Sequence, residues 1–164
     1  MRKLLRVFKP FRVYKSYKFF FWSFSEKKLF LKSLFWLTFA KIAIPIFSFK
    51  RLQPYLGQVS EEVIFLPKPD QVLKNRQVRV AILRASSVLP FHSQCLVTAI
   101  CARRLLRDLG CSPRLYLGVA KDKNKKEFQE SAGPGLMAHA WVKLGNEWTV
   151  GKSETDFTVV KIFA

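Results

Sequence analysis

Two residues of this sequence have the side chains and the local setting that thiol chemistry requires. Cys95 opens an amphipathic segment, and His139 follows 44 residues later within the short apolar run 138–142. The reactive form of cysteine is the thiolate, which the positive end of a helix dipole favours and a nearby imidazole can generate. The pattern therefore predicts Cys95 as a nucleophile and His139 as its general base.

Each of these residues also has an ordinary structural interpretation. A free cysteine in a helix is commonly a small buried hydrophobe, and a histidine between two alanines can be a hydrogen-bonded core residue. His92 is the other histidine and competes as the base, but it precedes the helix, so its side chain is not directed at the thiol by sequence proximity alone. The two remaining cysteines, Cys101 and Cys111, are expected to be buried and unreactive.

Composition narrows the class of protein. The 164 residues are 49% hydrophobic, which suits one modest globular core. The net charge is +18, and residues 1–52 contribute +12 of it, from 13 Lys or Arg against one acid. Such a surface suits nucleic acid, an anionic lipid surface or an acidic polypeptide. No zinc-finger spacing, helix-turn-helix pattern or RNA-binding aromatic motif is present, so nucleic acid is the least favoured partner.

The cysteines and the N-terminal charges indicate where in the cell the protein is expected. Three cysteines without a Cys-x-x-Cys pair fit neither a disulfide framework nor a zinc site, which indicates a reducing compartment such as the cytoplasm. The early apolar runs are interrupted by basic residues, so a signal peptide is not predicted. The stretch 29–49 is broken by Lys32, Lys41 and Pro45, so a membrane span is not predicted either. Peripheral contact of residues 1–52 with the inner face of the membrane stays an alternative.

The first third of the chain predicts a helix at 26–44, capped by Ser25 and ended or kinked by Pro45. We expect its apolar face to pack against protein, with burial at a membrane surface as the alternative. This face comprises Leu31, Leu34, Phe35, Thr38 and Ile42. We divide the chain into a basic, aromatic helical lead-in at 1–57, a connector at 58–76 with one short structured piece near 59–66, and a core at 77–164.

Within the core, helices are expected to precede strands. The pattern predicts a helix at 76–89 and another that is capped by Ser93, contains Cys95 in its first turn and ends at Gly110. Strands are then predicted at 114–119, 137–144, 147–150 and 156–162, with a charged loop at 121–135 and a hairpin turn at Gly145-Asn146. Helices followed by antiparallel strands define an α+β fold.

Six short motifs occur in a fixed order: Leu89-Pro90, Cys95-Leu96, Ala99, 105–110, 115–119 and 138–142. Together they resemble those of the lasso-peptide leader peptidases, the transglutaminase-like maturation B proteins in their stand-alone form. The resemblance implies a papain-like or transglutaminase-like core in which the nucleophile helix packs on a small antiparallel sheet. It also implies that Cys95 is the nucleophile, that His139 is the general base and that backbone amides near Gln94 stabilise the oxyanion.

The third catalytic residue is left open. Many relatives place an aspartate where this chain has Gly151, twelve residues after His139. A two-residue turn at Gly145-Asn146 predicts a register with Lys152 opposite His139 and Glu154 on the same side. Glu154 and Asp156 are therefore candidates, and a Cys-His dyad without an acid is the alternative.

The resemblance implies a cysteine endopeptidase that removes the leader from a ribosomally made lasso-peptide precursor. It implies three partners: the precursor, a separate leader-recognition protein, and an ATP-dependent cyclase that uses the freed amine. No metal or organic cofactor is implied. Two other functions stay open: a transglutaminase-like acyltransferase using the same Cys-His pair, and a non-catalytic basic membrane-surface protein.

Overall fold

The computed structural model describes residues 22–47, 51, 53, 56–62, 65–91, 94–121 and 136–164. Three long helices come first: α1 (Phe24–Ile46), α3 (Pro69–Val88) and α4 (Cys95–Asp108). Four strands follow: β1 (Arg114–Lys121), β2 (Leu136–Leu144), β3 (Glu147–Val150) and β4 (Thr158–Phe163). The predicted α+β class with an N-terminal helix is confirmed.

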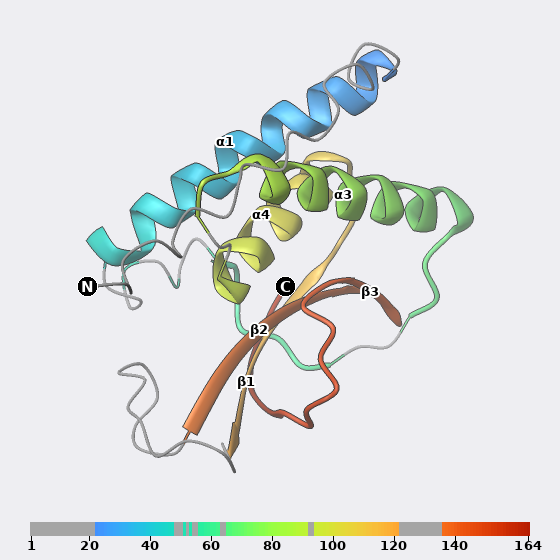
Figure 1. The fold of residues 1–164 in the computed structure, drawn as a ribbon. Coiled ribbons are helices and arrows are strands. Elements are labelled where there is room, and N and C mark those ends of the chain that lie inside the picture. Colours follow the sequence, from blue (N-terminus) through green and yellow to red (C-terminus); the bar gives the residue numbers. More distant parts are fainter. Residues whose placement is uncertain are drawn as a thin grey trace, which may run out of the picture.

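The helices form a layer on one side of the sheet, and α4 lies in the middle of the molecule (Figure 1). It packs against α1 and α3 on one side and against β2 on the other. One hydrophobic cluster joins all these elements, and burial of each large aliphatic side chain in it contributes roughly 1.5–3 kcal/mol. Its members include Leu37 of α1, Ile82 of α3, Leu105 of α4 and Val142 of β2.

The sheet is antiparallel throughout, with the strand order β3-β2-β1-β4. The β2–β3 turn is made by Gly145-Asn146, with Gly145 at φ +58, and Leu144 pairs with Glu147 as predicted. Beyond this the predicted register is wrong. Lys143 pairs with Trp148, but Val142 pairs with Val150, so one extra residue, Thr149, is inserted as a β-bulge.

The α1 helix presents a different face to the core from the one predicted. Its buried positions are Leu29, Ser33, Leu37, Ala40 and Ala43, whereas Leu31, Phe35 and Ile42 of the predicted face are exposed. The helix is apolar around most of its circumference, so its periodicity does not distinguish one face from another. The small residues at 33, 40 and 43 allow α3 and α4 to approach closely, and this packing selects the face of α1 that is buried.

Helix boundaries also differ from the predictions. The N-cap of α1 is Ser23, which forms a reciprocal capping box with Glu26, and the helix continues through Pro45. Helix α3 begins at Pro69, seven residues before the predicted start at 76. Proline suits the first turn of a helix, where its missing N–H has no intrahelical acceptor to lose. The second part of the predicted connector at 58–76 is therefore the start of α3.

Other predicted segments fall partly or wholly outside the described residues. Of the predicted structure near 59–66, the described part shows a single bridge between Val59 and Phe163. His92, Ser93 and most of the loop 121–135 lie outside the described residues. The N-cap of α4 is Gln94, so the prediction that Ser93 caps this helix is wrong. The domain boundaries at 57 and 76 stay predictions, although α1 and α4 share one core.

Candidate active site

Cys95 is the first residue of α4, and its thiol is half-buried against the core cluster. The residue before it, Gln94, is the N-cap in extended conformation, with φ −65 and ψ 151, and its side chain makes no capping hydrogen bond. The first N–H groups of a helix have no intrahelical acceptor and form its positive end. These groups can stabilise a sulfur anion or an oxyanion bound beside Cys95.

The other two cysteines are buried, as predicted. Cys101 is fully enclosed on α4, where its Sγ lies 3.8 Å from the carbonyl oxygen of Ser33. Burial raises the pKa of the Cys101 thiol to about 12 and also raises the pKa of Cys111. A thiol that stays protonated at neutral pH is a poor nucleophile, so both cysteines are structural.

His139 lies on β2, opposite Gly118 of β1, and its ring is partly buried. Its Nε2 lies 2.8 Å from the backbone carbonyl oxygen of Gly151. Because a carbonyl can only accept, Nε2 must be the protonated nitrogen that donates this bond. In the neutral ring the lone pair is then on Nδ1, which is the nitrogen available to take a proton from a thiol.

Two aromatic rings surround the imidazole. Phe157 stacks on it with the ring centroids 4.8 Å apart, and Trp141 lies 6.0 Å away. Trp141 is itself buried and lies across Gly118, where an added Cβ would come within 2.8 Å of the indole ring. These rings restrict water around the imidazole, which strengthens the hydrogen bond to Gly151.

The backbone at Gly151 explains why glycine stands there. Its φ is +79, and an added Cβ would lie 2.6 Å from the carbonyl oxygen of Ala140. Gly151 lies two residues after the bulge residue Thr149, whose hydroxyl donates a 2.7 Å hydrogen bond to Oδ1 of Asn75 in α3. Both of these side chains are buried. The bulge and this polar pair therefore bring the Gly151 carbonyl, rather than a side chain, to the ring.

The predicted acidic residues are placed differently. Glu154 and Asp156 are exposed, and neither forms a hydrogen bond or ion pair with His139 in the part of the chain that the structure describes. With the shift at Thr149, β3 ends at Val150, so Lys152 has no paired position opposite the histidine. Sequence reasoning missed the carbonyl contact because a main-chain acceptor has no side-chain signature. The one sequence feature that pointed to this contact was Gly151, which stands where an acid was expected.

Cys95 and His139 come from elements that pack directly on each other, α4 and β2. The thiol contacts the main core cluster, while the imidazole stacks with the smaller aromatic group around Trp141. Within the described residues no hydrogen bond joins Sγ of Cys95 to the His139 ring. In enzymes without bound substrate such contacts are often long and tighten only in the substrate complex. The pairing of these two residues is therefore a proposal that chemistry must test.

No group of three or more His, Cys, Asp or Glu side chains suitable for a metal ion occurs among the described residues. The main-chain amides at the start of α4 and the carbonyl of Gly151 are polar groups that suit acyl chemistry.

Comparison with known proteins gives one match. The family model described as the transglutaminase-like superfamily matches residues 35–161, a range that contains both Cys95 and His139. No curated protein and no solved structure matches the chain.

Proposed function

The chain belongs to the transglutaminase-like superfamily, and from this premise we propose that it is a cysteine endopeptidase that removes the leader from a lasso-peptide precursor. The superfamily includes cysteine peptidases and acyltransferases. The observation that carries the proposal is the hydrogen bond from His139 Nε2 to Gly151, which leaves Nδ1 free to act as a base. The substrate class rests on the resemblance of the sequence motifs to the leader peptidases.

In the proposed reaction, Nδ1 of His139 takes the proton of the Cys95 thiol, and the thiolate attacks the carbonyl carbon of the scissile bond. The N–H groups at the start of α4, at Gln94 and Cys95, stabilise the oxyanion of the tetrahedral intermediate. The imidazolium returns its proton to the departing amine, and a thioester forms. Water, deprotonated by the same imidazole, then releases the leader and the thiol. Throughout, the carbonyl oxygen of Gly151 accepts the hydrogen bond that Nε2–H donates, and this bond strengthens when the ring is charged.

The principal test is cleavage of the precursor by the purified chain in the presence of a leader-recognition protein, followed by mass spectrometry. Cys95→Ala and His139→Ala are expected to abolish cleavage while preserving the circular dichroism spectrum, because neither change opens a large cavity. Cys101→Ala is the matched control for loss of a thiol and is expected to cleave. Cleavage by the Cys95→Ala protein would refute Cys95 as the nucleophile. No cleavage by the unchanged chain would refute the peptidase, leaving the basic membrane-surface protein as the alternative.

The distance between the two proposed catalytic residues can be tested separately. The bifunctional reagent 1,3-dibromoacetone can alkylate a thiolate and then an adjacent imidazole, which leaves a three-carbon bridge. We expect peptide mapping of the treated protein to find Cys95 joined to His139. Alkylation of Cys95 without any bridge, in the presence of the precursor as well as in its absence, would contradict the proposed pair.

An acyltransferase is the second candidate, because the superfamily includes such enzymes and a thioester can be captured by an amine instead of water. Mass spectrometry of the reaction with an added trial amine distinguishes the two outcomes. A released leader with a free carboxylate supports hydrolysis, and a leader carrying the amine supports transfer.

We further propose that the protein acts in the cytoplasm with a separate leader-recognition protein, and that the freed amine passes to an ATP-dependent cyclase. The basic N-terminal third supplies a candidate docking segment. Helix α1 belongs to the core, so a deletion that tests docking must stop before it. Removal of residues 1–21 is expected to reduce copurification of the recognition protein or the cyclase, and retention of both would refute a docking role.

A further inference from the structure

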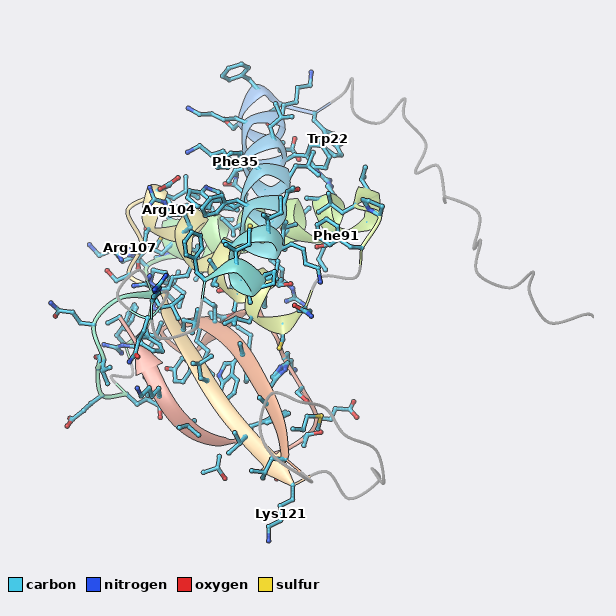
Figure 2. All side chains as sticks on the ribbon, turned by 90° about the vertical axis from the view of Figure 1, so that its left-hand side faces the viewer. Trp22, Phe35, Phe91, Arg104, Arg107 and Lys121 are labelled. Atoms are coloured by element: carbon cyan, nitrogen blue, oxygen red, sulfur yellow. The ribbon has the colours of Figure 1, made fainter. Side chains whose placement is uncertain are left out.

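A groove lies between the second half of α1 and the C-terminal half of α4, on the side of the molecule where Arg104 and Arg107 are labelled in Figure 2. It has a volume of about 790 Å³. Its wall on α1 is apolar and includes Phe39 and Phe47, whereas α4 contributes Arg103, Arg104 and Arg107. No acidic residue is among the described residues that line it. The groove therefore combines an apolar surface with concentrated positive charge.

No Asp or Glu side chain among the described residues pairs with the charge at the bottom of this groove. Arg103 is only 5% exposed, and its Nη2 donates a 2.8 Å hydrogen bond to a main-chain oxygen of Ala164. Its Nε is buried without a partner. Burial, followed by the nearby charge of Arg107, lowers the pKa of Arg103 to about 10. Burial of a guanidinium is costly, and a bound anion would offset part of that cost.

Arg104 differs from its neighbours in this respect. Its Nε lies 3.2 Å from a carboxylate oxygen of Asp108, and its guanidinium lies over the ring of Trp36. Neither Arg103 nor Arg107 has an Asp or Glu side chain as a partner among the described residues. The groove is thus lined by the pair Arg103 and Arg107 without an acidic side chain, together with exposed Arg51.

The outer face of α1 continues this surface. Phe35, Phe39, Ile42 and Ile46 recur at helical spacing, and each is at least 50% exposed. Figure 2 shows Phe35 on the same flank of α1 as Arg104 and Arg107, with Trp22 and Phe91 on the other flank. Exposed aromatic and branched side chains beside arginines are typical of helices that lie in a membrane interface.

We propose that this groove and the outer face of α1 bind an anionic phospholipid bilayer, with a lipid phosphate held by Arg51 and Arg107 above the buried Arg103. The apolar stripe of α1 then enters the boundary between headgroups and acyl chains. By length and composition α1 could also cross a membrane. Its packing on α3 and α4 favours a helix lying flat on the domain, because a spanning helix would lose that packing.

Charge distinguishes the bilayer from two other occupants. Residues 1–21 carry seven Lys or Arg and no acid, so this segment would bring like charge to the arginines. A second copy of the chain, with a net charge of +18, would do the same. A bilayer containing anionic lipids supplies both the negative headgroups and the apolar layer that the surface lacks.

The proposed membrane surface is separate from the candidate active site. Arg107 is twelve residues after Cys95 on the same helix, which corresponds to roughly 18 Å along its axis. The proposal does not depend on the proposed function. The Cys95→Ala protein is expected to bind vesicles as well as the unchanged chain, so loss of peptidase activity and loss of membrane binding can be told apart.

The test is flotation of the full chain with vesicles of phosphatidylcholine alone or mixed with phosphatidylglycerol. The variant R51Q/R107Q removes two exposed arginines from the groove, and the control R76Q/R79Q removes two exposed helical arginines from α3. We expect binding only to the mixed vesicles, about 30-fold weaker for R51Q/R107Q, since each charge at the surface contributes about 1 kcal/mol. The control is expected to bind within about threefold of the unchanged protein.

A second pair of double variants tests the apolar part of the surface. F35S/I42S changes the outer face of α1, and V88S/V160S changes exposed apolar residues elsewhere. Only the first is expected to lose vesicle binding. Equal losses in the two arginine doubles, equal binding to both vesicle types, or no flotation at all would overturn the proposal. Loss of precursor binding in R51Q/R107Q with vesicle binding retained would show a peptide site instead, and resistance to salt extraction would show a spanning helix.

Discussion

The substitution Gly151→Ala tests how the proposed base is held. The native backbone at this position has φ +79, and an alanine Cβ would meet the carbonyl oxygen of Ala140 at 2.6 Å. The chain must therefore rotate or move away from β2. Either response displaces the carbonyl oxygen that accepts the 2.8 Å hydrogen bond from Nε2 of His139.

Gly110 provides the control for backbone strain. Its φ is +74, close to that of Gly151, but nothing lies within 4 Å of an added Cβ. Gly110→Ala is expected to cost about 1–2 kcal/mol of stability from the left-handed conformation alone. Gly151→Ala carries the same cost plus roughly 1–3 kcal/mol for the forced contact with β2.

The Gly151→Ala and Gly110→Ala proteins are expected to differ more in their rate of cleavage than in their stability. A positioned general base contributes typically 10²–10⁴-fold to the rate, and an imidazole without its Nε2 acceptor distributes its proton between both nitrogens. Gly151→Ala should therefore lower kcat by about 100-fold or more, and Gly110→Ala by less than about threefold. Gly151→Asp should be equally inactive, because its Cβ meets the same obstacle.

The assay combines urea denaturation of both variants with precursor cleavage at a temperature where each is fully folded. Nitrogen-15 NMR of the His139 ring adds a readout that a purely structural role would not change. The native ring should be protonated at Nε2, and the Gly151→Ala ring should be a mixture of tautomers. Equal cleavage by the Gly151→Ala and Gly110→Ala proteins, or an Nδ1-protonated ring in the native chain, would refute the reasoning.

Further predictions concern the acids, the thiols and the buried arginine. Glu154→Gln and Asp156→Asn should each change cleavage by less than about threefold, because neither carboxylate touches the imidazole, and a larger loss would identify the missing acid. At about pH 8 iodoacetamide should modify Cys95 and leave Cys101 unmodified, since burial raises the Cys101 pKa to about 12; peptide mapping decides this. Arg103→Met should stabilise the fold by roughly 1–3 kcal/mol in urea denaturation. The folded pKa of Arg103, about 10, lies below its ordinary value, so the cost of its charge is fully present below pH 10 and fades above it. The advantage of Arg103→Met should therefore be constant between about pH 6 and pH 9, and a loss of stability would contradict this account.

The parts of the fold that depend on local signals were predictable from sequence. The change of period after Pro113, the Gly145-Asn146 turn and the amphipathic helix that starts at Cys95 all correspond to observed elements. The core-facing side of α1 was not predictable, because both of its faces are apolar and only contact with α3 and α4 selects one. The start of α3 was missed because Pro69 can end a connector or begin a helix.

The candidate site, too, could be predicted only in part from the sequence. Residue types and helix position were sufficient to select Cys95 and His139 as candidates. The bulge at Thr149 depends on Asn75, which lies in another helix and is distant in sequence, so no local pattern predicts it. The contact between His139 and Gly151 follows from that bulge, so it could not be predicted from the sequence either.

The imidazole of this protein is held by the main chain, and this has a consequence for how related proteins should be recognised. A search that requires a cysteine, a histidine and an acid would reject this sequence, although a carbonyl oxygen fixes the same tautomer that a carboxylate would. Inactive-looking relatives with glycine at the position of the acid therefore merit assay before they are classified as non-enzymes.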